Sequence, residues 1–201
     1  MKIAITGTTK GIGKAIKKQL LLKDYKVKDI NRSDYDLSNF NNIIDIDLTG
    51  CDVLINNAGH DIGMGNNYKT MKKEDIINQV NVNLLSPMLL THSFVQQNKS
   101  GTVINITSGS INDLKENMVT YYTTKSALSC FTKAINIDLK DKFRFVEVIP
   151  RRVKTNFFET SNATHLKTSQ YLVKAKEVAK VILYIIDNPL ITNITIKDHR
   201  R

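Results

Sequence analysis

Tyr121 and Lys125 are the residues whose types and spacing point most directly to chemistry. Residues i and i+4 share one face of a helix, so the phenol and the ammonium can point into a single cleft. A cation beside a phenol lowers the pKa of the phenol from roughly 10 by about 1–3 units, which allows proton exchange near neutral pH. Tyr122 cannot take this role, because the residue four positions after it is Ser126. We therefore predict that Tyr121 is a general acid or base whose pKa is lowered by Lys125.

Ser108 can supply a hydroxyl to the same cleft, because it directly follows the strand-like segment 101–107. Side chains at the carboxyl end of a strand face the crevice in which open α/β sheets bind their ligands. A hydroxyl there can donate a hydrogen bond to a bound ligand. Ser110 is the rival hydroxyl, slightly further along the chain.

A glycine-rich segment, Thr6-Gly7-Thr8-Thr9-Lys10-Gly11-Ile12-Gly13, lies between the first expected strand and the first expected helix. Glycines let the backbone turn sharply and approach phosphate groups, while a helix N-terminus offers free N–H groups and the positive end of its dipole. The segment therefore predicts a site for the pyrophosphate of a dinucleotide. A tight turn without a ligand is the alternative that this segment alone leaves open.

Strand-like and helical segments alternate along the chain, and these elements must position the residues above. The 201 residues predict one domain over 1–201, since a domain takes roughly 150 residues. The alternation predicts an α/β fold, a Rossmann-like doubly wound parallel sheet with helices on both faces. The connection after the second strand is short, so we expect only an abbreviated strand at 34–38 and a short helix at 39–47. The expected strands are 2–6, 25–30, 51–55, 102–106, 143–149 and 191–196, and the expected helices are 11–22, 72–97, 120–139 and 175–187.

The spacing Gly-x-x-x-Gly-x-Gly, the segment Asn56-Asn57-Ala58-Gly59 and the pair Tyr121-x-x-x-Lys125 follow one another in an order that resembles the short-chain dehydrogenase/reductase family. The matching residues run from Thr6 to Thr155, and the expected last helix and strand fit the family's fold. The resemblance implies an oxidoreductase that transfers a hydride between a nicotinamide cofactor and a small-molecule carbonyl or alcohol. It also implies a homodimer or homotetramer.

The resemblance assigns roles to individual residues. Ser108 matches the family's catalytic serine, whose hydroxyl would hold the carbonyl oxygen of the substrate while Tyr121 delivers or removes the proton. Lys125 would also hold the hydroxyls of the nicotinamide ribose. Asn83 matches a helix asparagine that supports a chain of water behind the lysine, with Asn81 as a close competitor. The expected cofactor-binding residues are Gly7, Thr9, Lys10, Gly11, Ile12, Gly13, Asn31, Arg32, Asp36, Leu37, Asn57, Ala58, Gly59, Tyr121, Lys125, Pro150, Val153 and Thr155.

The residues after the second expected strand bear on which nicotinamide cofactor is used. An acidic residue at this place holds the ribose of NAD(H) and would repel a 2′-phosphate. This chain has Asn31 there, with Arg32 beside it and Lys10 in the glycine-rich segment. A guanidinium can bind a phosphate through two parallel hydrogen bonds. We therefore predict NADP(H) rather than NAD(H), and the alternative is a solvated Arg32 with Asp34 or Asp36 approaching the ribose.

Three features depart from the family's pattern. Arg151 stands where the family has a glycine, and if that place needs a positive φ, an arginine costs about 1 kcal/mol or more and displaces the loop. Arg151 could instead meet an anionic substrate or a cofactor phosphate. The segment 156–174, where the family has its substrate lid, is mostly polar, and the usual C-terminal Asp-Gly-Gly is absent. Arg151 and the shortened segments motivate a second hypothesis, a dinucleotide-binding regulatory or interaction protein with little turnover.

Charge and composition bear on the remaining classes. Lys and Arg total 29 against 19 Asp and Glu, a net charge of +10, which leaves a basic nucleic-acid binder as a third hypothesis. The densest lysine group, over 14–28, interleaves with apolar residues at helical spacing and predicts a solvated helix face rather than a polyanion patch. Without a recognition motif we expect no nucleic-acid partner. No apolar run approaches the roughly 20 residues of a membrane span and no signal-peptide pattern occurs, so we expect no membrane partner and a cytoplasmic location.

Cysteine and histidine usage indicates neither a disulfide nor a metal site. Cys51 and Cys130 are far apart in the chain, and the four histidines are scattered without ligand spacing. We therefore expect two buried free thiols and no bound metal.

Overall fold

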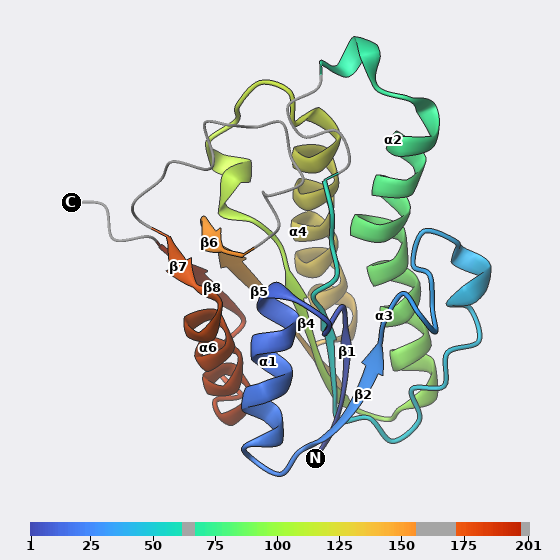
Figure 1. The fold of residues 1–201 in the computed structure, drawn as a ribbon. Coiled ribbons are helices and arrows are strands. Elements are labelled where there is room, and N and C mark those ends of the chain that lie inside the picture. The colour runs from blue at the N-terminus through green and yellow to red at the C-terminus, as the bar shows by residue number, and fades with distance from the viewer. Residues whose placement is uncertain (62–66, 156–171, 198–201) are drawn as a thin grey trace.

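A parallel sheet forms the centre of the protein (Figure 1). The computed structural model describes residues 1–61, 67–155 and 172–197. Within these residues the central sheet has the order β2-β1-β3-β4-β5-β8, and all of its pairings are parallel, which confirms the predicted doubly wound α/β fold. The strands are β1 Lys2–Thr6, β2 Lys26–Ile30, β3 Val53–Asn56, β4 Gly101–Ile106, β5 Phe143–Pro150 and β8 Asn193–Ile196.

Helices cover both faces of the sheet (Figure 1). Two of them, α1 and α6, lie side by side on one face, and α2, α3 and α4 lie on the other. On the outer side of α1, Lys14 and Lys18 are exposed as predicted for a solvated face, whereas Lys17 is half-buried and pairs with Asp29. The helices are α1 Gly11–Leu21, α2 Lys73–Val80, α3 Ser86–Gln97, α4 Val119–Leu139 and α6 Ala175–Asp187.

The hydrophobic core is divided by the sheet into two clusters. Successive side chains of a strand point to opposite faces, and in β1 Ile3 and Ile5 pack with α1 and α6 while Ala4 packs with Leu90 and Phe94 of α3. The same alternation recurs in β3, β4 and β5. Because both faces of the sheet are buried, each central strand is a continuous run of apolar residues. Such runs are the pattern from which these strands were predicted.

The segment between β2 and β3 contains no strand, so the prediction of a strand at 34–38 is wrong. Residues 34–38 form turns, and the helical part of 39–47 is limited to the 3₁₀ turn η1, Phe40–Asn42. The strand β3 pairs directly with β1 and leaves β2 at the edge of the sheet. The segment's apolar side chains are buried through core packing instead of strand pairing: Leu37, Ile43, Ile46 and Leu48.

The helix predicted over 72–97 is present, with one local change of winding. The π-helical segment η3, Asn81–Leu85, joins α2 to α3 without a break in the helical run. Such segments are rare and often occur at functional sites, because the wider turn redirects the side chains that it carries. Asn83, the predicted support residue, lies in η3.

Short elements complete the described structure. The 3₁₀ turn η2 is Tyr68–Thr70, and a second one, η4 (Gly109–Asn112), follows β4. The two-residue strands β6 (Val153–Lys154) and β7 (Val173–Lys174) pair with each other. The predicted lid over 156–174 lies almost wholly outside the described residues.

Three expectations from composition can be compared with the structure. Cys51 is buried as predicted, but Cys130 is exposed because it lies on the solvent side of α4, so the prediction of two buried thiols is wrong there. None of the described helices is long and apolar enough to cross a membrane. The described residues also contain no cluster of three or more His, Cys, Asp or Glu suited to a metal ion.

Candidate active site

The glycine-rich turn between β1 and α1 is built for close backbone approach. Gly7 has φ +70°, in the left-handed region that favours glycine. A Cβ on Gly13 would lie 2.0 Å from the carbonyl oxygen of Gly7, so only glycine fits there. The first turn of α1 has no acidic residue and no side-chain cap, which leaves its positive end available to an anion. These residues therefore fit the phosphates of a dinucleotide.

The segment after β3 holds this turn in place. The amide of Asn57 donates from Nδ2 to the carbonyl oxygens of Thr6 and Gly7, at 2.8 and 3.1 Å. The backbone N–H groups of Asn57 and Ala58 in turn donate to Oγ1 of Thr6, at 3.0 and 2.8 Å. The Asn-Asn-Ala-Gly segment is thus a rigid support for the glycine-rich turn.

One cavity of ≈ 360 Å³ brings the predicted residues together. Every residue predicted to bind the cofactor lines this cavity, from Gly7 in the glycine-rich turn to Thr155 after β6. Ser108, Tyr121 and Lys125 line it as well, so the turn and the proposed proton donor share one space. Asn83 is not among the lining residues and lies behind them.

The hydroxyl groups of Ser108, Ser110 and Tyr121 gather at the end of β4. Ser108 caps η4, and its Oγ lies 2.7 Å from Oγ of Ser110. Ser108 is only 8% exposed and forms a hydrogen bond with Tyr121 that lowers the pKa of the phenol. Both serines line the cavity, but Ser108 is the one paired with Tyr121.

The predicted lowering of the Tyr121 pKa by Lys125 is wrong for this structure. Burial dominates and raises the pKa of Tyr121 to about 12. Burial also lowers the pKa of Lys125 to about 8. The Lys125 ammonium donates to the carbonyl oxygen of Ile106 at 3.0 Å, and it is not among the groups that shift the phenol. Because they share a helix face, both residues line the cavity, but the charge of Lys125 does not determine the pKa of Tyr121.

Asn83 links the π-helical segment to the residues around Lys125. Its Nδ2 donates to the carbonyl oxygen of His60 at 2.8 Å and to Oγ1 of Thr124 at 3.3 Å, and its Oδ1 accepts from the His60 N–H at 2.9 Å. A Cβ on Gly59 would lie 3.3 Å from both Oδ1 of Asn83 and Nζ of Lys125, so these atoms flank the same glycine. Its competitor Asn81 instead donates to the carbonyl oxygen of Ser38 at 2.7 Å.

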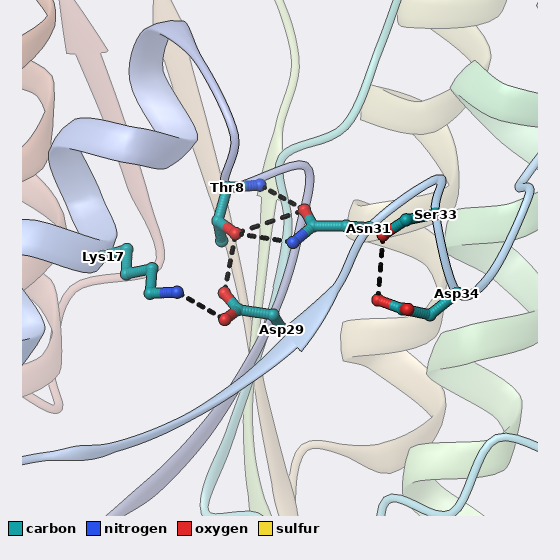
Figure 2. Close-up of polar contacts among 6 residues, drawn as sticks. All are labelled: Thr8, Lys17, Asp29, Asn31, Ser33 and Asp34. Atoms are coloured by element: carbon teal, nitrogen blue, oxygen red, sulfur yellow. Dashed lines mark hydrogen bonds and ion pairs between the residues drawn. The ribbon is translucent and has the colours of Figure 1, made fainter.

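The acidic residue near the end of β2 is Asp29, whose carboxylate is engaged by Thr8 and Lys17 (Figure 2). Its carboxylate accepts from Oγ1 of Thr8 at 2.6 Å and pairs with Nζ of Lys17 at 2.5 Å. Thr8 also binds Asn31, because its N–H donates to Oδ1 of Asn31 at 2.9 Å. Asp29 is absent from the cavity lining, where Asn31 and Arg32 stand instead.

The remaining charged residues at this end are Arg32 and Asp36. The exposed guanidinium of Arg32 lies 3.8 Å from Oδ1 of Asp36. Hydrogen bonds from the backbone and side chain of Ser38, with a smaller contribution from Arg32, lower the pKa of Asp36. The carboxylate of Asp36 is therefore already engaged within its own turn.

A polar cluster of His60, Asp61 and Gln79 lies near Tyr121. Nε2 of Gln79 donates to Oδ1 of Asp61 at 2.9 Å, while Oδ2 of Asp61, Nε2 of His60 and Oε1 of Gln79 are buried without a partner among the described residues. Burial raises the pKa of Asp61 to about 6 and lowers that of His60. Asp61 lies near enough to Tyr121 for its charge to raise the pKa of the phenol.

Arg151 keeps an ordinary backbone despite standing in place of a glycine. The described non-glycine residues with positive φ are Asp24 and Asn117, so the strain considered for Arg151 does not arise. Its N–H donates to the carbonyl oxygen of Ile196 at 2.9 Å, which continues the pairing of β5 with β8.

Sequence reasoning missed several residues that line the cavity. His60 could have been found, because it directly follows Ala58-Gly59. The others lie in strands, turns and loops whose approach to the cavity depends on the folded path of the chain and carries no local motif. The cavity-lining residues that the sequence did not indicate include Ile30, Tyr35, His60, Val82, Ile106, Thr107, Asp113, Lys115, Met118, Tyr122 and Arg152.

Comparison with known proteins identifies the family. Residues 29–166 match the family described as short chain dehydrogenase. A benzil reductase ((S)-benzoin forming) of Bacillus cereus is 30% identical over 190 residues, covering 77% of this chain and 76% of that protein. A 3-ketoacyl-(acyl-carrier-protein) reductase from Brucella melitensis, complexed with NADH, has the same fold with a TM-score of 0.85 at 20% identity, covering 97% of this chain and 96% of that chain. An alcohol dehydrogenase from Thermococcus sibiricus, complexed with 5-hydroxy-NADP, gives 0.83 at 21% identity, with 100% and 98% covered. The chain therefore belongs to the short-chain dehydrogenase/reductase family of oxidoreductases.

Proposed function

We propose that this protein is an NADP(H)-dependent oxidoreductase that interconverts a carbonyl and an alcohol on a small molecule. The observation that carries the proposal is the single cavity lined at once by the glycine-rich turn, Ser108, Tyr121 and Lys125. A nucleotide-binding regulator has no chemical need for a hydrogen-bonded serine–tyrosine pair in the cavity that would hold its nucleotide. Relatives that are reductases and structural neighbours with bound nicotinamide cofactors support the same reaction class.

The protein's own residues would position the substrate oxygen and handle one proton. A nicotinamide cofactor, when bound, supplies or accepts the hydride. Ser108 and Tyr121 donate hydrogen bonds to the substrate oxygen and stabilise the developing alkoxide. A phenol with a pKa of about 12 is fully protonated at neutral pH. Tyr121 is therefore poised as the general acid of carbonyl reduction, which we take as the favoured direction.

Lys125 and Asn83 have supporting roles in this proposal. Lys125 lines the cavity and can hold the ribose hydroxyls of the cofactor as a hydrogen-bond donor. Asn83 acts as a positioning residue, because it fixes the backbone of His60 on both its N–H and its carbonyl side. The segment Asn57-Ala58-Gly59 lines the cavity and supports the glycine-rich turn.

The preference for NADP(H) rests on the charges at the end of β2. Arg32 and Lys10 line the cavity there, and both can bind a 2′-phosphate. The carboxylate of Asp29, which could otherwise favour NAD(H), is occupied by Thr8 and Lys17 (Figure 2). At the position where an acidic residue would favour NAD(H), this chain has the neutral Asn31, which is held by Thr8.

Cofactor binding followed by turnover tests the proposal. Titration with NADPH and NADH, monitored by nucleotide fluorescence, should give tighter binding of NADPH, and failure to bind either would refute the proposed function. Arg32→Ala should weaken NADPH binding by at least tenfold and NADH binding far less. Lys23→Ala removes one exposed positive charge elsewhere and serves as the control. Equal losses for both cofactors in Arg32→Ala would contradict the phosphate assignment.

Oxidation of NADPH over a panel of aldehydes, ketones and quinones tests catalysis. Tyr121→Phe should abolish turnover while leaving cofactor binding intact, and Tyr184→Phe on the exposed side of α6 should leave both unchanged. Binding of the cofactor without turnover, unaltered in Tyr121→Phe, would favour the regulatory alternative. Assembly as a homodimer or homotetramer stays a prediction that sedimentation would test.

A further inference from the structure

A group of charged side chains surrounds the cavity where Ser108 lies. Asp113 lies between two cations, with Nζ of Lys115 at 2.7 Å and Nη2 of Arg151 at 3.9 Å. Arg152 adds a third positive charge that acts on Asp113. These four residues line the same cavity as Ser108, and together they carry a net charge of +2.

Arg151 brings its positive charge close to the reacting end of the cavity. A Cβ on Gly109 would lie 2.7 Å from Cγ of Arg151, so the arginine stem packs directly on the residue that follows Ser108. The Arg151 backbone is fixed by its hydrogen bond to Ile196, which extends the regular edge of the sheet. The guanidinium therefore projects from a residue that directly follows β5 and is joined to β8 by a backbone hydrogen bond.

This second group of cations lies on other segments of the chain than the cations that we assign to the phosphates of a nicotinamide cofactor. The residues that fit those phosphates come from the β1–α1 turn and the end of β2, where Lys10 and Arg32 line the cavity. Lys115, Arg151 and Arg152 instead come from the segments that follow β4 and β5. Because Arg151 packs on Gly109, this positive surplus lies beside Ser108, the serine proposed to hold the substrate oxygen.

We propose that Arg151, Arg152 and Lys115 form a subsite for an anionic group of the substrate, a carboxylate or a phosphate attached near the reacting carbonyl. This inference rests on the proposed oxidoreductase function. Guanidinium groups bind both anions through paired, charge-assisted hydrogen bonds. Asp113 holds the cations apart and oriented, and a substrate anion shares them with this carboxylate. The substrate class is thus a carbonyl acid or carbonyl phosphate rather than a neutral ketone or aldehyde.

Three aldehydes with matched rings test this subsite in the enzyme with NADPH. The probes are 4-carboxybenzaldehyde, 4-formylphenyl phosphate and the neutral methyl 4-formylbenzoate. We expect kcat/KM for at least one anionic aldehyde to exceed that for the ester by about tenfold or more. The preferred anion identifies carboxylate or phosphate as the group that is recognised. Equal or higher kcat/KM for the ester would overturn the proposal.

Variants separate a recognition role from a structural one. Arg151→Gln should lower kcat/KM for the preferred anionic aldehyde by about tenfold, mainly through KM, with turnover of the ester unchanged. Asp113→Asn should have the opposite effect and lower KM for the anion, because it removes the competing carboxylate. Lys23→Gln changes the net charge as Arg151→Gln does, far from the cavity, and should change neither substrate. Equal losses for ester and anion in Arg151→Gln, or weaker anion binding in Asp113→Asn, would contradict the subsite.

Binding measurements keep the inference separate from the proposed function. If NADPH binds but none of the aldehydes is reduced, calorimetric titration of the NADPH complex with benzoate, phenyl phosphate and neutral benzamide still tests the subsite. Tighter binding of an anion than of benzamide, lost in Arg151→Gln, would support it, and equal binding would refute it. Failure to bind any nicotinamide cofactor would instead refute the proposed function, and with it the substrate role of these cations.

Discussion

Replacing Asp61 by asparagine should change the stability of this protein in a pH-dependent way. One carboxylate oxygen of Asp61 accepts a hydrogen bond from Gln79, and the other is buried without a partner among the described residues. Burial raises the pKa of Asp61 from 3.8 to about 6. Asparagine keeps nearly the same shape and the acceptor for Gln79 but carries no charge. Asp61→Asn therefore isolates the effect of the buried charge.

The size and sign of the effect follow from proton linkage. The folded protein binds the Asp61 proton more tightly than the unfolded chain, so the wild-type protein loses stability as the pH rises from 3.8 to about 6. A shift of about two pKa units, at 1.36 kcal/mol each, gives a loss of up to about 3 kcal/mol. Asp61→Asn should thus be more stable than the wild type at pH 8 by up to about 3 kcal/mol, and this gain should disappear at pH 3.5.

Urea unfolding at several pH values between 3.5 and 8 measures this difference. Asp34→Asn makes the same chemical change on an exposed side chain and should alter the free energy of unfolding by no more than about 0.5 kcal/mol. Removing a negative charge from a chain of net charge +10 increases general repulsion, so a non-specific effect would have the opposite sign. An Asp61→Asn difference that is the same at pH 3.5 and pH 8 would refute the reasoning, as would an equal gain in Asp34→Asn.

Two further substitutions test how the site is held together. Gly13→Ala should destabilise the fold by about 1–3 kcal/mol and abolish NADPH binding, because its Cβ would lie 2.0 Å from the Gly7 carbonyl oxygen. Gly50→Ala adds a Cβ with nothing within 4 Å, so it carries the strain of its positive φ but no clash. A melting temperature of Gly13→Ala no lower than that of Gly50→Ala would contradict the clash. Asn83→Ala leaves the half-buried N–H of His60 without its partner and the His60 carbonyl with only the longer hydrogen bond from Gln79. It should lower the free energy of unfolding in urea by about 1–3 kcal/mol, whereas no loss would show that the π-helical segment is not anchored through this side chain.

The architecture was largely predictable because its central strands are buried on both faces. Such strands appear in a sequence as short Val- and Ile-rich runs between turns, and β4 and β5 begin and end within one residue of their predicted bounds. Apolar runs did not give the correct structure for the segment 34–48. Its apolar residues are buried by turns that pack against the sheet, and a pattern of buried apolar residues does not distinguish that packing from strand pairing.

The candidate site was predictable where its chemistry is local in the sequence. The glycine-rich turn and the Tyr121–Lys125 pair are defined by spacing, and the structure places both around one cavity. The electrostatics were not predictable in this way. The acceptor of the Lys125 ammonium is a carbonyl at the end of β4, remote in sequence from α4, and the burial that lowers the pKa of Lys125 depends on the folded structure.

Net charge illustrates the same limit. The sequence shows a surplus of +10 but not where it acts. Among the described residues that line the cavity, six are Lys or Arg and two, Asp36 and Asp113, are carboxylates. Arg32 and Lys10 could be predicted to line the cofactor site from their positions in the sequence motifs. Arg152 and Lys115 reach the cavity only through the folded path of their loops. A cavity that is positive at both ends suits a cofactor and a substrate that are each anionic. These ligands account for the cations of the cavity without a nucleic-acid-binding surface.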